Sequence, residues 1–152
     1  MTHPPLADVP VRSAADLTRR WATLLDPPVF TARSLWLAWL EPDGRMLPIV
    51  VPVDELPPLP QGSTLSGLLT LHDAVAEQTG WAEGHLALAL CRPGPAGVTE
   101  DDAEWADALQ AELDDLLDGT WSLHVAAAGS VVPLVVPPRW GRALPTDNGT
   151  IG

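Results

Sequence analysis

Hydrophobic residues along this chain follow two spacings, one typical of helices and one typical of strands. In three segments they recur every three or four residues, and elsewhere they form short runs bounded by glycine, proline and aspartate. We therefore predict helices over residues 13–25, 64–78 and 99–118. Strands are predicted over residues 34–40, 45–53, 86–90, 121–126 and 131–135.

This order of elements favours one α/β domain with a three-layer arrangement. We expect a mixed sheet of about five strands, flanked by about three helices. The domain is predicted to span residues 13–136. Residues 1–12 and 137–152 are rich in proline or glycine and are expected to be flexible ends.

Residues 85–118 form the unit around which the other elements are expected to pack. Its apolar run, residues 86–90, is typical of a strand that is covered on both faces. Prolines and glycines in residues 93–97 then exclude regular structure, because proline fixes φ and glycine permits positive φ. Thr99 and Asp102 follow with a spacing close to that of a capping box, so they are predicted to begin the next helix.

The predicted helix after this loop has one apolar stripe and a strongly acidic remainder. Trp105, Leu109, Leu113 and Leu116 recur at helical spacing and are expected to face the core. Nine of the chain's twenty acidic residues lie between positions 100 and 118, and no base lies among them.

This unbalanced charge makes the helix a candidate docking surface. Asp107, Glu112 and Asp115 are the residues we select to represent it. A partner protein with a basic surface would be drawn to such a helix, and the attraction would weaken with salt. The alternative is a solvated face with no partner.

Composition narrows the classes of function further. The net charge is −12, and a surface of that sign repels nucleic acid. No apolar run approaches the ~20 residues of a membrane-spanning helix, and the N-terminus lacks the features of a signal peptide. The single cysteine, Cys91, cannot form an internal disulfide, which favours a cytoplasmic location.

The order of elements, with its proline- and glycine-rich loop, resembles the MPN/JAMM metalloprotease fold and most closely the RadC-like bacterial branch. The resemblance covers roughly residues 33–136. Family members have a strand that ends in His-x-His-Pro, then the loop, then a serine and an aspartate three residues apart that begin a helix. The corresponding residues here are Leu90, Cys91, Arg92 and Pro93 at the strand end and Thr99 and Asp102 at the helix start.

The resemblance implies the family's fold but not its peptidase activity. Leu90 and Arg92 stand at the two histidine positions, and residues 48–52, in the strand where the family has a catalytic glutamate, read Pro-Ile-Val-Val-Pro. Only Asp102 is left as a metal ligand, whereas a catalytic zinc site needs three protein ligands. We therefore expect no metal and no cofactor.

These observations favour a non-catalytic, pseudoenzyme-like cytoplasmic domain that acts through protein–protein interaction. One alternative is a hydrolase with a relocated metal or thiol site, for which several nucleophilic or ligating side chains would have to meet in one cleft. The candidates for it are His72, His85, Cys91, Asp102 and His124. Taken singly, a buried inert role is expected for Cys91 and a hydrogen-bonded core role for His72.

A second alternative is a pocket for a small molecule or a peptide. It would be lined by Trp36, Trp39 and the loop of residues 92–98. Within this loop region, Arg92, Thr99 and Asp102 are the candidate binding residues, and Arg92 would hold a carboxylate or a phosphate. The competing interpretation is that Arg92 pairs with a nearby acid such as Asp102.

Overall fold

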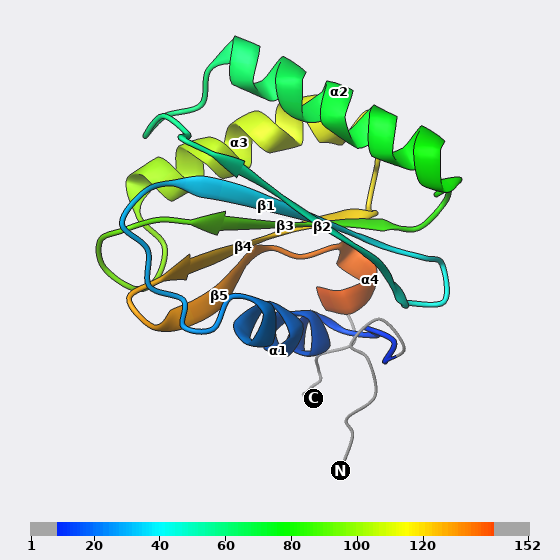
Figure 1. The fold of residues 1–152 in the computed structure, drawn as a ribbon, viewed down its shortest axis with the longest axis horizontal. Coiled ribbons are helices and arrows are strands. Elements are labelled where there is room, and N and C mark those ends of the chain that lie inside the picture. Colours follow the sequence, from blue (N-terminus) through cyan, green and yellow to red (C-terminus); the bar gives the residue numbers. More distant parts are fainter. Residues whose placement is uncertain (1–8, 142–152) are drawn as a thin grey trace.

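The computed structural model describes residues 9–141 and contains one five-stranded mixed sheet with helices on both faces (Figure 1). The predicted α/β class is therefore confirmed. The strands are β1 (Ser34–Leu40), β2 (Met46–Asp54), β3 (His85–Cys91), β4 (Trp121–Ala127) and β5 (Ser130–Val135). The helices are α1 (Ala14–Leu24), α2 (Gly62–Thr79), α3 (Glu100–Leu113) and the single turn α4 (Pro138–Gly141).

The strand order across the sheet is β2-β1-β3-β4-β5. Neighbouring strands are antiparallel except β3 and β4, which are parallel and joined by α3, as a crossover connection requires. The strands at the two edges contain prolines, namely Pro48 and Pro52 in β2 and Pro133 in β5. Proline is tolerated at an edge because it has no N–H to donate to a neighbouring strand, which agrees with the predicted edge position of β2.

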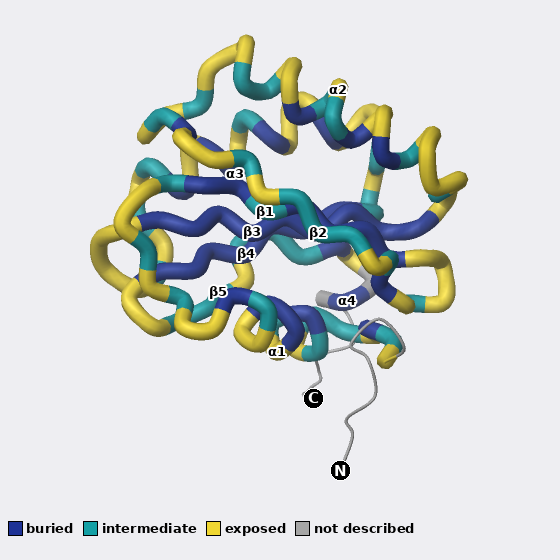
Figure 2. Tube along the Cα trace, in the orientation of Figure 1, coloured by how far each residue is buried: buried dark blue, intermediate teal, exposed yellow. Residues whose placement is uncertain are grey.

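Two hydrophobic cores lie on opposite faces of the sheet. In Figure 1, α2 and α3 cover one face, and α1 and α4 lie against the other. Leu86, Leu88 and Leu90 of β3 pack in the core under α2 and α3, whereas Ala87 and Ala89 pack in the core on the α1 side. Figure 2 shows β1, β3 and β4 buried along most of their length. The apolar run of β3 is thus covered on both faces, as predicted.

Helix α3 is shorter than the predicted segment 99–118. It ends at Leu113, and residues 114–119 form turns instead. The N–H groups of Leu116 and Leu117 both donate to the Leu113 carbonyl, which tightens the chain there. Leu117 then packs against the core while Leu116 is 60% exposed, so the prediction that Leu116 belongs to the apolar stripe was wrong.

The packed part of the chain begins before residue 13 and continues past residue 136. Val11 is buried, and its N–H donates to the carbonyl of Gly44 in the β1–β2 turn at 2.8 Å. At the other end, α4 places Trp140 in the core on the α1 side. The predicted domain boundaries were therefore too narrow, because isolated apolar residues in proline-rich ends show no periodicity. The remaining parts of the predicted flexible ends, residues 1–8 and 142–152, lie outside the described residues.

Among residues 9–141, no helix is both long enough and apolar enough to cross a membrane.

Candidate functional site at the end of strand β3

The end of β3 carries a buried ion pair between Arg92 and Asp102. Arg92 directly follows the strand and Asp102 lies in the first turn of α3. Their side chains are 1% and 0% exposed. Arg92 Nε donates to Asp102 Oδ1 at 2.8 Å and Arg92 Nη2 donates to Asp102 Oδ2 at 2.7 Å, a bidentate geometry that suits the planar guanidinium. The interpretation that Arg92 pairs with Asp102 is therefore confirmed.

The remaining donors of Arg92 hold the loop. Nη1 donates to the carbonyls of Pro93 and Pro95 at 3.1 and 2.8 Å, and Nη2 donates to the carbonyl of Gly97 at 2.8 Å. A guanidinium has five N–H donors, and these three bonds with the two to Asp102 use all of them. In this conformation no donor of Arg92 is left to hold a carboxylate or a phosphate.

Asp102 and Thr99 begin the helix as a capping box. The Thr99 hydroxyl accepts from the Asp102 N–H at 3.3 Å, and Asp102 Oδ2 accepts from the Thr99 N–H at 2.9 Å. Burial by itself would raise the pKa of Asp102, but hydrogen bonds from Arg92 and Thr99 and the charge of Arg92 lower that pKa below its ordinary value. Asp102 therefore stays ionised at neutral pH and is fully engaged with Arg92 and Thr99.

Cys91 lies beside this ion pair in sequence but on the face of the sheet that α1 covers. The thiol is fully buried, and burial raises its pKa to about 12 despite a hydrogen bond with Ser34. Because the thiolate is the nucleophilic form, such a cysteine is unreactive at neutral pH.

The three histidines of the domain are held in separate environments. His72 belongs to α2, on the other face of the sheet from His85 and His124, and its Nδ1 accepts from Trp39 Nε1 at 3.0 Å. Burial lowers the pKa of His72. This ring also contacts the Trp81 ring edge-on. His72 is thus a hydrogen-bonded core residue, as expected for it when taken singly.

His85 and His124 share the α1 face but lie apart along the sheet. His124 is opposite Ala89, four residues beyond His85, a step of about 13 Å along a strand. His85 Nε2 lies 2.8 Å from Ser122 Oγ, and His124 Nε2 lies 2.8 Å from Thr18 Oγ1 of α1. Burial alone lowers the pKa of His124 to about 4.

The structure does not bring the candidate hydrolase residues into one cleft. Cys91, His85 and His124 lie on the α1 side of the sheet, whereas His72 and Asp102 lie on the other. Within the described residues, no three histidine, cysteine, aspartate or glutamate side chains are arranged so that they could hold a metal ion.

The two tryptophans proposed for a shared pocket point to opposite faces of β1. Trp39 is fully buried under α2, where it bonds His72, and Trp36 packs half-buried on the α1 side. A single pocket lined by both Trp36 and Trp39 is therefore excluded. The expectation failed because adjacent side chains in a strand alternate between faces, and positions 36 and 39 differ by an odd number.

The acidic segment of residues 100–118 is exposed over most of its length. Two of its acids are offset by arginines from elsewhere, since Asp101 lies 3.6 Å from Arg33 and Asp102 pairs with Arg92. The acids that remain exposed are Glu100, Glu104, Asp107, Glu112, Asp114, Asp115 and Asp118. Of the selected residues, Asp107 and Glu112 lie on α3, whereas Asp115 lies in the turn after it, so this surface is only partly helical.

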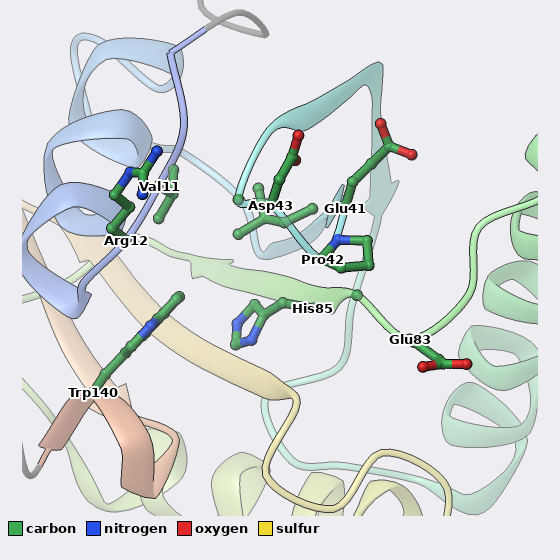
Figure 3. Close-up of a pocket in the computed structure, with 11 residues that line it drawn as sticks. Val11, Arg12, Glu41, Pro42, Asp43, Glu83, His85 and Trp140 are labelled. Atoms are coloured by element: carbon green, nitrogen blue, oxygen red, sulfur yellow. The ribbon is translucent and has the colours of Figure 1, made fainter.

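A cleft at the opposite end of β3 was not predicted from the sequence. It has a volume of about 610 Å³ and lies between residues 11–12, the β1–β2 turn, residues 83–85 and Trp140 (Figure 3). Two of its walls come from segments that were expected to be flexible ends. The signal that pointed to them was Trp140, a large aromatic residue in an otherwise proline- and glycine-rich stretch.

Comparison with known proteins adds no relative: the chain matches no model of a protein family, no curated protein and no solved structure.

Proposed function

We propose that this chain is a non-catalytic α/β domain that acts by binding another protein. The first half of the proposal, that the domain is non-catalytic, rests on one observation. The guanidinium of Arg92 lies against Asp102, the one ligand-type residue that the resemblance to the MPN/JAMM fold leaves in place, and it uses all five donors there. A fixed positive charge at this carboxylate takes up the interaction that a metal ion would otherwise make.

The resemblance to the RadC-like branch supports this proposal in a specific way. The strand, loop and capped helix that would surround a metal are all present as elements, yet the ligand positions hold Leu90, which is fully buried, and Arg92. We infer that the chain is a degenerate member of that fold in which the loop is held by an arginine. A cytoplasmic location agrees with the presence of a single cysteine, which cannot form a disulfide within the chain.

Peptide hydrolysis tests the non-catalytic half. The purified full chain is incubated with a mixed library of peptides in the presence of zinc, and the products are followed by mass spectrometry. We expect the same cleavage products from the parent chain with zinc, from the parent chain in buffer without zinc, and from the Asp102→Asn variant. Cleavage that requires zinc and is lost in the Asp102→Asn variant would contradict the proposal.

The second half of the proposal names the partner by its charge. Exposed acids extend from α3 into the following turns. Arg33 and Arg92 offset Asp101 and Asp102, but within the described residues no ion pair offsets the acids of residues 103–118. We propose that a basic protein surface docks here. Capture of partners at low and at high ionic strength tests this idea, because contacts between exposed charges are screened by salt. Partners that are retained equally at both ionic strengths would exclude a charge-driven contact.

A further inference from the structure

Helix α1 covers a face of the sheet that carries a fully buried histidine, His124 (Figure 1). His124 lies on β4, next to the central strand β3. Its one hydrogen bond among the described residues joins Nε2 to Thr18 Oγ1 of α1 at 2.8 Å. Within residues 9–141 no strand precedes α1, so this helix can leave the sheet without breaking any strand pairing. This face is separate from the acidic surface at α3, and the inference does not depend on the proposed function.

The hydrogen bonds of Thr18 fix the neutral tautomer of His124. The Thr18 hydroxyl donates its single proton to the Ala14 carbonyl at 2.9 Å, so its oxygen accepts from His124 Nε2–H. The other ring nitrogen, Nδ1, is buried and has no hydrogen-bond partner among the described residues. A proton added at Nδ1 would therefore create a buried cation with no acceptor beside it, which is unfavourable while α1 is docked.

No charged group of the described chain compensates such a cation. On α1, Asp16 pairs with Arg19, and the buried Arg20 donates to the Val9 carbonyl. Strand β5, on the other side of β4, has no ionisable residue. Burial alone lowers the pKa of His124, and within the described residues no carboxylate raises it. The ionisable groups of the segments packed around this face are Arg12, Asp16, Arg19, Arg20, His85 and Cys91.

The contact between α1 and the sheet also buries polar groups that are poorly satisfied. Trp21 is fully buried there, yet its Nε1–H has no acceptor among the described residues. Arg20 is 6% exposed and has no carboxylate partner in the part of the chain that the structure describes. Water would satisfy these groups once α1 left the sheet. They therefore lower the free energy that is needed to open α1 locally.

We propose that α1 is an acid-sensitive cover, which stays docked while His124 is neutral and leaves the sheet locally when His124 takes up a proton. In the open form the imidazolium is hydrated, so the cost of burying its charge disappears. Opening also exposes Cys91, which is fully buried in the same core as Leu17 and Trp21 of α1. The core under α2 and α3 stays packed, because it lies on the other face of the sheet.

The direction and size of the response follow from proton linkage. The pKa of His124 is about 4 with α1 docked and near 6.5 when the ring is in water, so the open form binds the proton more tightly. The ratio of open to docked α1 is therefore expected to rise by about twentyfold from pH 7 to pH 5.

Amide hydrogen exchange of the full chain at pH 7, 6 and 5, read by mass spectrometry, tests this proposal. Exchange rates are converted to opening constants with the intrinsic rates at each pH. We expect the α1 amides to have larger opening constants than those of β3 and α3, and to show the twentyfold rise. Reaction of Cys91, the single cysteine, with a disulfide reagent is expected to rise in parallel, when divided by the rate of the unfolded chain at the same pH.

Two matched variants assign the response to one histidine. His124→Gln keeps a side-chain N–H for Thr18 and is expected to abolish the acid response of α1, whereas His72→Gln, on the other face, is expected to retain it. The comparison of α1 with α3 in the parent chain needs neither variant. The proposal is overturned if α1, β3 and α3 open with equal constants at every pH, as in global unfolding. It is also overturned if acid leaves either the α1 amides or Cys91 protected, or if His124→Gln responds like the parent.

Discussion

Burying Arg92 with Asp102 is tolerated because the hydrogen-bonding capacity of both groups is met. Taking two charges out of water costs several kcal/mol per ion, and the bidentate contact, the three loop carbonyls and the Thr99 N–H offset that cost. The same reasoning explains why the sequence alone suggested two roles for Arg92. An arginine beside a glycine-rich loop is equally consistent with holding the loop and with holding a ligand, and only the geometry distinguishes them.

Removal of either member of this pair is therefore expected to destabilise the fold strongly. We predict that Arg92→Ala and Asp102→Ala each lower the free energy of unfolding by about 3–5 kcal/mol, because each leaves a buried charge without its partner. Replacing both residues with leucine is expected to cost much less than the sum of the two single losses. Urea denaturation measures these values, and single losses below about 1 kcal/mol would show that the pair is not buried in solution.

The burial of His124 predicts that the stability of the fold depends on pH between about 4 and about 6.5. Burial lowers its pKa to about 4, while an unfolded histidine titrates near 6.5, so the unfolded state binds more protons between these values. Stability is thus expected to fall as the pH drops from about 6.5 to about 4, by up to roughly 3 kcal/mol. Glutamine at this position can still bond Thr18 through its side-chain amide. His124→Gln is therefore expected to flatten this slope, apart from the part that His72 contributes.

Thermal or urea unfolding at several pH values between 7 and 4 provides the measurement. His72→Gln serves as the matched control. Burial also lowers the pKa of His72, but this histidine lies on the other side of the sheet. An unchanged slope in His124→Gln would mean that His124 is not buried in its neutral form.

At the scale of elements, hydrophobic periodicity predicts which segments form packed helices and strands. It predicts less well the residues at which these elements end. The helix over residues 13–25 and the five strands agree closely with α1 and β1–β5, because each has a regular apolar spacing. Gly80, in the left-handed conformation, ends α2 as expected. The end of α3 was misjudged because Leu116 continues the apolar spacing past Leu113, whereas backbone bonds to the Leu113 carbonyl change the course of the chain there.

Two glycines allow a test at this scale, since they differ in surroundings. Gly67 in α2 has no neighbouring atom within 4 Å of an added Cβ, whereas Gly84 has the Leu40 carbonyl oxygen at 1.9 Å. We predict that Gly67→Ala raises the free energy of unfolding by about 0.5–1 kcal/mol, because alanine loses less backbone entropy in a helix. Gly84→Ala is expected to lower it by about 2 kcal/mol or more, through backbone displacement between β1 and β3.

Denaturation curves of the two alanine variants, measured side by side with the parent, decide this prediction. Similar effects in both variants would contradict the close approach of residue 84 to β1.

At the scale of the whole molecule, the acidic surface and the cleft lie at different parts of the sheet. The acidic surface belongs to the side that α2 and α3 cover (Figure 1). The cleft lies at the start of β3 and is lined in part by Trp140 of α4. The acidic surface could be recognised in the sequence because its residues are contiguous. The cleft could not, because its lining comes from residues 11–12, 40–44, 83–85 and 140, which only the fold brings together.

Charge reversal at the acidic surface tests the claim that this domain works by binding a basic partner. The variant carries Asp107→Lys, Glu112→Lys and Asp115→Lys, and the control carries Asp26→Lys, Asp54→Lys and Glu77→Lys, which are also exposed. Both change the net charge by the same amount, so a difference between them reports on position rather than on total charge. We predict that partners captured by the parent at low salt are lost with the first variant and retained with the control. Equal capture by the parent and by the first variant would contradict the account.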